Sequence, residues 1–215
     1  MDFQNDEFLN NILRDLQDSK HIPLEDLPNI DLYMDQLTTF MDNRLASTKR
    51  YSEDKVLTKT MINNYAKNKI LPSPNKKQYT TEHLITLLFI YYFKSFLSIT
   101  DIQKLLEPIE EKYFDQDKIN LKHIYSEVFS MEDEALKKLR ADVEEKYATS
   151  RETFAEVPEK DRDLLQKFAF ICELCFDVYL KKNIVEKLID DLPDPKQDSK
   201  KQKAAQKATK EKAKK

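Results

Sequence analysis

Glycine is absent from all 215 residues of the chain, and this absence excludes several kinds of protein. Glycine serves where the backbone takes a positive φ or must come close to a ligand. A Walker A loop, a Gly-x-Gly-x-x-Gly dinucleotide turn and a Gly-x-Ser-x-Gly nucleophile elbow are therefore excluded. Helices tolerate a lack of glycine better than sheets joined by tight turns, so the sequence predicts a mostly α fold.

Cysteine and long apolar runs are also scarce. Only Cys172 and Cys175 are present, which excludes a disulfide framework and favours a reduced, cytoplasmic location. They lie within an apolar helical run, so we interpret them as core residues; a thiol sensor or a metal ligand is the alternative. The longest apolar run, residues 84–93, is too short to cross a membrane. No nucleophile paired with a base and no metal-ligand spacing is visible, so we expect no enzyme, cofactor or metal.

Positive charge is concentrated in one segment. Residues 49–79 hold eight basic and two acidic side chains, whereas residues 1–48 and 80–194 are both net negative. Such a basic segment favours contact with nucleic acid, because releasing counterions from phosphate rewards local positive charge. The alternative is a basic helix that is only solvated.

The basic segment runs into the most informative stretch, residues 57–106. A helix is predicted at 59–68, with Thr58 as its N-cap and with Leu57, Met61 and Tyr65 on its inner side. A short basic wing follows Pro72 and Pro74. Amide, hydroxyl and ammonium groups on the outer side of a helix suit the major groove of DNA, and ammonium groups on a wing suit phosphate. The predicted DNA-binding residues are Lys59, Thr60, Asn63, Asn64, Lys67, Lys76 and Lys77.

The order of these residues resembles the DNA-binding half of the MerR family of transcription regulators. That family has a reading helix that ends in Tyr and a Leu-Leu-x-Pro exit, then a wing with a basic-x-Tyr signature. The corresponding residues here are Ile62-Asn63-Asn64-Tyr65, Ile70-Leu71-Pro72 and Lys77-Gln78-Tyr79. An apolar helix at 80–96 and a short helix at 97–106 follow in the expected order. The run also resembles a bacterial domain-of-unknown-function family 1836, from about Leu27 onwards.

The chain departs from the MerR pattern at four places, one of which is a wing that lacks its usual Gly. Asn63 stands where those proteins usually carry Arg, and Lys69 stands where they place Gly at the helix exit. We expect Asn68 to take the left-handed C-cap conformation instead. The first helix of the motif, at 30–45, is separated from the reading helix by about a dozen residues rather than by a tight turn. The resemblance therefore implies a winged helix-turn-helix fold more directly than it implies particular base contacts.

Apolar periodicity predicts helices outside this motif at 1–19, 119–147 and 159–190. The first has an apolar stripe of Phe3, Phe8, Ile12 and Leu16. Thr81 and Ser98 are the predicted N-caps of the helices that follow the wing. The two long C-terminal helices suit dimerisation, or could fold back within one subunit. We divide the chain into an N-terminal helix and loop (1–26), a MerR-like winged-helix domain (27–108), a helical dimerisation or effector region (109–192) and a disordered Lys-rich tail (193–215).

These features predict a cytoplasmic, sequence-specific regulator of transcription that binds duplex DNA through a winged helix-turn-helix. We expect it to act as a homodimer, with an unknown small molecule or protein as effector and without a membrane partner. The alternative is a helical protein-interaction adaptor that keeps the winged-helix fold but does not bind specific DNA.

Overall fold

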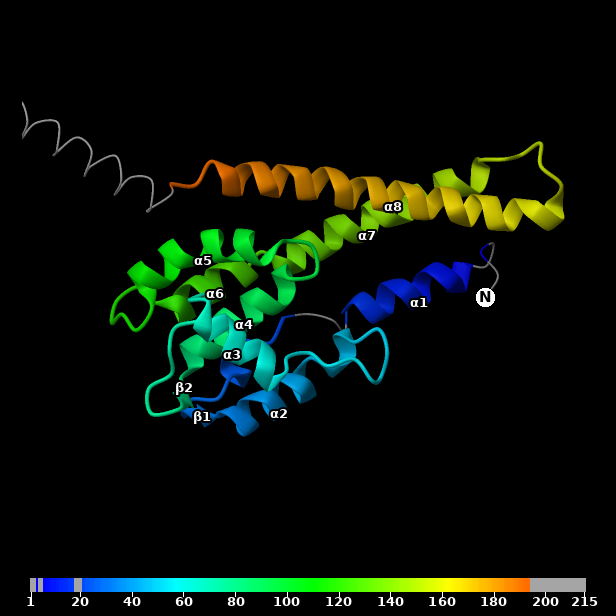
Figure 1. The fold of residues 1–215 in the computed structure, drawn as a ribbon. Helices are drawn as coiled ribbons and strands as arrows, with labels where there is room; N and C mark the ends of the chain where they lie inside the picture. The colour runs from blue at the N-terminus through cyan, green and yellow to red at the C-terminus, as the bar shows by residue number, and fades with distance from the viewer. Residues whose placement is uncertain (1–2, 4–5, 18–20, 194–215) are drawn as a thin grey trace, which may run out of the picture.

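The computed structural model describes residue 3 and residues 6–17 and 21–193 (Figure 1). The described chain is mostly helical, which confirms the predicted class, and two short strands complete it. No helix in these described ranges is both long and apolar enough to cross a membrane. The elements are α1 (Asp6–Gln17), η1 (Leu24–Asp26), β1 (Leu32–Tyr33), α2 (Met34–Arg44), η2 (Ala46–Thr48), α3 (Lys59–Lys67), β2 (Gln78–Tyr79), α4 (Thr81–Phe93), α5 (Ile99–Tyr113), α6 (Leu121–Phe129), α7 (Glu132–Glu152) and α8 (Glu159–Asp190).

Helix α4 is the buried centre of the larger of two hydrophobic cores. Its first ten residues are all buried, as its nearly continuous apolar sequence predicts. Thr80 is the N-cap instead of the predicted Thr81, and its backbone N donates to His83 Nδ1 at 3.1 Å. The hydroxyl of Thr81 donates to the carbonyl oxygen of Pro28 at 2.7 Å. A tertiary hydrogen bond therefore decides which of the two threonines caps the helix.

The segment between α2 and α3 is long, and hydrogen bonds to side chains of α4 and of the residue after it fix its position. It spans residues 45–58, in agreement with the long connection expected from the sequence. Lys94 Nζ, at the end of α4, donates to the carbonyl oxygen of Val56 at 2.7 Å. The hydroxyls of Thr48 and Tyr91 are also hydrogen-bonded to each other. These contacts fix the connection, and with it the place where α3 begins.

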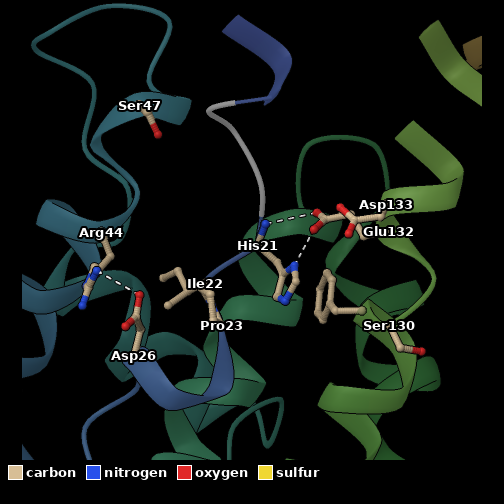
Figure 2. A pocket seen from close by; sticks show the side chains of 10 residues that line it. His21, Ile22, Pro23, Asp26, Arg44, Ser47, Ser130, Glu132 and Asp133 are labelled. Atoms are coloured by element: carbon tan, nitrogen blue, oxygen red, sulfur yellow. Dashed lines mark hydrogen bonds and ion pairs between the residues drawn. The ribbon is translucent and has the colours of Figure 1, made fainter. Parts of the chain in front are cut away.

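The single helix predicted over 119–147 is wrong, because α6 ends at Phe129 and α7 begins at Glu132. His21 occupies this break (Figure 2). Its ring stacks on Phe129 with centroids 4.4 Å apart, and its backbone N donates to Glu132 Oε1 at 3.1 Å. Its Nδ1 lies 2.5 Å from Glu132 Oε2. A residue distant in sequence thus supplies contacts that a continuous helix would not accommodate.

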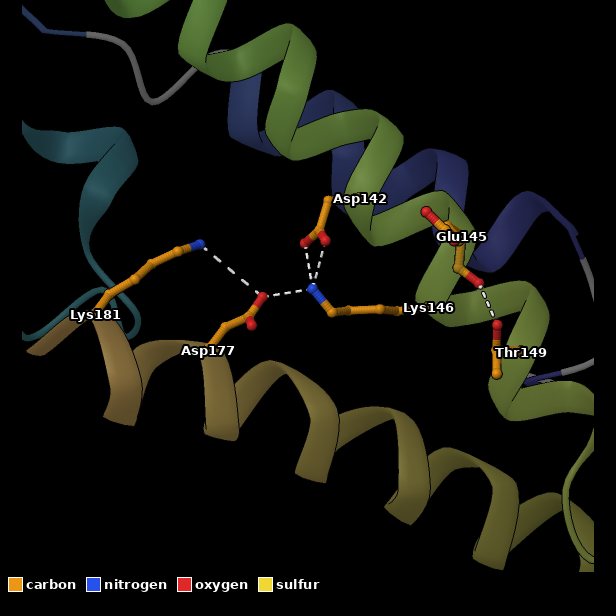
Figure 3. Close-up of polar contacts among 6 residues, drawn as sticks. All are labelled: Asp142, Glu145, Lys146, Thr149, Asp177 and Lys181. Carbon is orange, nitrogen blue, oxygen red and sulfur yellow. Dashed lines mark hydrogen bonds and ion pairs between the residues drawn. The ribbon is translucent and has the colours of Figure 1, made fainter.

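The smaller core joins α1 to α7 and α8. Its buried members are Phe3, Leu9, Leu13, Val143, Tyr147 and Phe170. The stripe predicted for the N-terminal helix is wrong at Ile12, which is 40% exposed, because Leu9 and Leu13 face α7 instead. The side chain of Leu16 lies outside the described residues. Lys146 also ties α7 to α8, with Nζ 2.5 Å from carboxylates of Asp142 and Asp177 (Figure 3).

The predicted division of the chain does not follow the ends of the helices. The boundary after residue 108 falls inside α5, which continues to Tyr113. Cys172 and Cys175, predicted in the core, are half-buried and exposed respectively, because α8 turns other residues toward α7. The tail predicted at 193–215 lies, apart from Pro193, outside the described residues.

Candidate nucleic-acid interface

Helix α3 starts at the predicted cap, since Thr58 Oγ1 accepts from the backbone N of Met61 at 3.2 Å. Ile62 and Tyr65 are its buried residues. The prediction that Met61 lies on the inner side is wrong, because Met61 is 37% exposed and Ile62 is fully buried. Ile62 lies three residues before Tyr65 and therefore shares its helix face.

The outer side of α3 carries every residue that the sequence assigned to it. Lys59, Thr60, Asn63, Asn64 and Lys67 are all exposed. Their inner neighbours pack toward α2 and the large core, so the helix cannot rotate these side chains inward without exposing apolar ones. The side chains form one surface of amide, hydroxyl and ammonium groups.

The exit of α3 differs from the prediction by one residue. Asn68 has a right-handed conformation with φ −88°, whereas Lys69 has φ 58°. The backbone N atoms of Ile70 and Leu71 then bond to the carbonyl oxygen of Tyr65 at 2.9 and 3.3 Å. Lys69 itself, and not the expected Asn68, takes the left-handed position at the place where the MerR pattern has glycine.

The wing is a tight turn with two lysines at its centre. The backbone N of Gln78 donates to the carbonyl oxygen of Asn75 at 2.8 Å. Lys76 and Lys77 have φ values of 48° and 66°, the combination found in type I′ hairpin turns. Both side chains are exposed, which leaves their ammonium groups at the tip.

Tyr79 anchors the wing to the rest of the domain. It is buried and pairs with Leu32 where β2 runs antiparallel to β1. Because β1 leads directly into α2, this short sheet connects the wing to the start of the helix that packs on α3.

A cleft of about 490 Å³ between α2 and α3 adds groups that the sequence did not reveal. Thr39 and Asn43 lie one helical turn apart on α2 and are exposed, and Lys55 comes from the connecting segment. Lys59 and Thr60 line the same cleft. The spacing of Thr39 and Asn43, four residues apart on one helix, could be recognised in the sequence. That these two side chains lie near α3 could not, because it depends on the tertiary fold.

Two carboxylates on α2 partly neutralise this surface. Asp35 forms an ion pair with Lys59, and Asp42 with Lys49 at 2.8 Å. The hydrogen bond from Lys49 lowers the pKa of Asp42, so this carboxylate stays charged at neutral pH. Among the described residues, no carboxylate lies within ion-pair distance of Lys67, Lys76 or Lys77. The ammonium groups at the end of α3 and at the tip of the wing are therefore more available to an outside partner than that of Lys59.

His83 lies at the base of the wing and is 3% exposed. Its ring packs edge-on against Tyr79 and Phe114, at 5.6 and 4.9 Å. Burial lowers its pKa, so it is neutral at physiological pH. Within the described part of the chain, no group of three or more His, Cys, Asp or Glu side chains is placed to hold a metal ion.

Comparison with known proteins gives one match. Residues 22–128 match the family described as Domain of unknown function (DUF1836). No curated protein and no solved structure matches the chain. The matched segment runs from before η1 into α6 and so contains α3, the wing and α4. Just under half of the chain, including the whole candidate interface, is thus similar to the DUF1836 family.

Proposed function

We propose that the protein is a regulator of transcription that binds duplex DNA in a sequence-specific manner through α3 and the wing. One observation carries this proposal: all seven predicted side chains are exposed, on α3 and on the wing turn that follows it in the chain, while Ile62, Tyr65 and Tyr79 are buried. Proteins that bind DNA do so with exposed basic and amide side chains such as these, which are not needed to pack the hydrophobic core.

The order of elements supports a MerR-like winged helix-turn-helix. Strand β1, α2, α3, a wing that returns to β1, and two further helices follow one another as in that pattern. The positive φ of Lys69 supports the same reading, because this residue replaces a glycine of the pattern. The long connection between α2 and α3 is the main departure.

The chemistry of each group assigns its role. Asn63 and Asn64 can pair with adenine through both amide atoms, and Thr60 can bond to either kind of base edge. Lys59 and Lys67 lie on either side of these residues and bind phosphates or guanines. The wing lysines, Lys76 and Lys77, hold phosphate and set the orientation on the duplex without reading sequence.

The test begins with selection of bound genomic fragments, which supplies a specific site. Asn63→Ala with Asn64→Ala is expected to weaken specific binding by about 1–3 kcal/mol for each amide–base pairing that it removes, and to leave binding to random DNA nearly unchanged. Asn10→Ala, an exposed amide on α1, is the matched control. Equal weakening on specific and random DNA would show that these amides only position the protein.

A protein-interaction adaptor is the second candidate function. It is favoured by the large apolar side chains that α8 exposes, because such surfaces mark protein contacts. The adaptor reading predicts no binding to any genomic fragment even at low salt. It also predicts that substitutions on α3 leave partner binding unchanged.

One of the hollows in the described part of the chain is a candidate location for the effector expected from the sequence. A hollow of about 500 Å³ lies between Arg44 at the end of α2, His21, and Glu132 at the start of α7 (Figure 2). Its volume lies in the range of small-molecule sites. A ligand there would touch both the motif helix α2 and the long helix α7.

A further inference from the structure

His83 lies where the wing joins the helices behind it and contacts both. Strand β2 leads directly into Thr80, whose backbone N donates to His83 Nδ1 at 3.1 Å. The hydroxyl of Thr80 is 2.9 Å from the same nitrogen. The ring of His83 packs edge-on against Tyr79 of the wing and against Phe114, the C-cap of α5. One side chain therefore holds the end of the wing to α4 and α5.

These contacts require the neutral form of the ring. Because Nδ1 accepts the bond from the backbone of Thr80, the proton of the neutral ring is on Nε2. A second proton would have to sit on Nδ1, where it would face the backbone N–H of Thr80 and break this bond. Nε2 is buried and has no hydrogen-bond partner among the described residues. The protonated ring would thus be a buried cation whose N–H groups are poorly matched.

The carboxylates around His83 do not compensate for such a cation. Asp31, before β1, and Asp115, after α5, favour the charged ring, but both are exposed. Neither lies within ion-pair distance of His83 in the described part of the chain. The buried carboxylate of Glu82, next to His83 on α4, accepts from the backbone N of Asp115 instead. Burial raises the pKa of the Tyr79 phenol, which therefore stays neutral in acid.

The balance of these influences favours the neutral ring while the wing is in place. The backbone of Pro72 and Ser73, where the chain enters the wing, favours the charged ring, but burial is the largest influence and lowers the pKa of His83. If the wing left the ring, His83 would regain its usual pKa of about 6.5. The docked wing therefore has its full stability above pH 6.5. Below this value each pH unit favours the detached wing by up to about tenfold, until the pKa of the folded state is reached.

We propose that His83 is a pH-sensitive latch of the wing: in acid it takes up a proton, releases Thr80 and Tyr79, and lets the wing detach from α4. This inference rests on the proposed function, because the lysines at the tip of the wing can act together with α3 only while the wing is docked. Acid should therefore weaken DNA binding. This direction is diagnostic, since added protons otherwise make a protein more positive and strengthen its attraction to phosphate.

Proton NMR with amide hydrogen exchange tests the latch without DNA. The chain has three histidines, so the ring signal of His83 is identified as the one that His83→Gln removes. We expect this ring to titrate below pH 6.5. The protection factor of the Thr80 amide should fall about five- to 30-fold between pH 6.5 and pH 5, while those of α7 stay constant. A ring that titrates at or above pH 6.5, or a constant protection factor at Thr80, overturns the proposal.

His83→Gln also separates the proton from the hydrogen bond. Glutamine is a usual capping-box residue at this position, because its side-chain oxygen can accept from the backbone N of the N-cap, and it takes up no proton in this range. The variant should keep the bond to Thr80 and lose the acid response of both amide exchange and DNA binding. His123→Gln, which changes an exposed histidine on α6, is the matched control and should keep both responses.

The two proposals can fail separately. An acid response in His83→Gln equal to that of the unchanged chain overturns the latch, whatever the affinity for DNA. Acid release of the Thr80 amide in a chain that binds no DNA at any pH supports the latch and counts only against the proposed function.

Discussion

The wing turn allows charge and backbone conformation to be tested separately. Lys76 and Lys77 both occupy left-handed conformations, which cost about 1–2 kcal/mol for a residue with a Cβ. Asn-Gly is the pair that type I′ turns prefer. We therefore expect Lys76→Asn with Lys77→Gly to make the folded protein more stable while it weakens DNA binding.

The size of both effects follows from the turn. Glycine removes the left-handed cost at position 77 but adds about 0.5–1 kcal/mol of backbone entropy loss, and asparagine gains less, so the net stabilisation is about 1 kcal/mol. This raises the melting temperature by about 2–4 °C in a protein of this length. Removing two phosphate-binding ammonium groups lowers the slope of log K against log salt by about 1.8, or about 30-fold in affinity at about 0.15 M salt.

Urea titration followed by circular dichroism measures the stability, and fluorescence anisotropy at several salt concentrations measures the binding. Lys76→Ala with Lys77→Ala is the charge-matched control, because alanine also has a Cβ and keeps the left-handed cost. The two variants should bind DNA equally weakly and differ in stability. Equal stability of the two would refute the left-handed turn, and an unchanged salt slope in both would remove the wing from the DNA interface.

Four further substitutions test single charges and hydrogen bonds of the structure. Asp35→Asn and Asp42→Asn should each strengthen DNA binding, by about 1 kcal/mol or less as for exposed ion pairs, and weaker binding would contradict the assigned surface. Burial raises the pKa of Glu110 from 4.5 to about 8, so the folded state holds a proton that the unfolded state releases, and stability falls as pH rises across that window. Glu110→Gln should therefore raise the melting temperature at pH 8 and change it little at pH 5; the same shift at both would contradict this pKa. Lys94→Met should cost about 1–3 kcal/mol in urea titration, because the carbonyl of Val56 loses its charged donor, and an unchanged stability would mean that this bond is not formed.

Local hydrogen bonding made the starts of helices predictable. The caps at Thr58 and Ser98 were both expected, and both accept from a backbone N three residues on, at 3.2 and 3.1 Å. Such bonds need only neighbouring residues. The cap at Thr80 and the break after Phe129 could not be predicted in this way, because contacts with Pro28 and His21 decide them.

The candidate site was predictable where one helix carries it and not where two segments meet. The exposure of Asn63 and Asn64 follows from helical periodicity once Tyr65 is inside. Lys55 and Asn43 come together only when α2 packs on α3. Helix α8 could not be oriented from its sequence for a similar reason. Apolar residues occur on its buried face and on its exposed face alike, so the sequence does not reveal which face α7 covers.

The last turns of α8 have a consequence for how the chain is made. Val185 and Ile189 pack into the large core, whose other members all lie between residues 22 and 129. Synthesis of the sixty residues from Phe129 to Ile189 takes about 3–12 s at ordinary translation rates. During this interval the nascent unit of residues 22–129 lacks part of its hydrophobic core. A ribosome-bound chain stopped near residue 130 should therefore be cut by protease within segments that resist it in the finished protein, and chaperones have a defined period in which to bind.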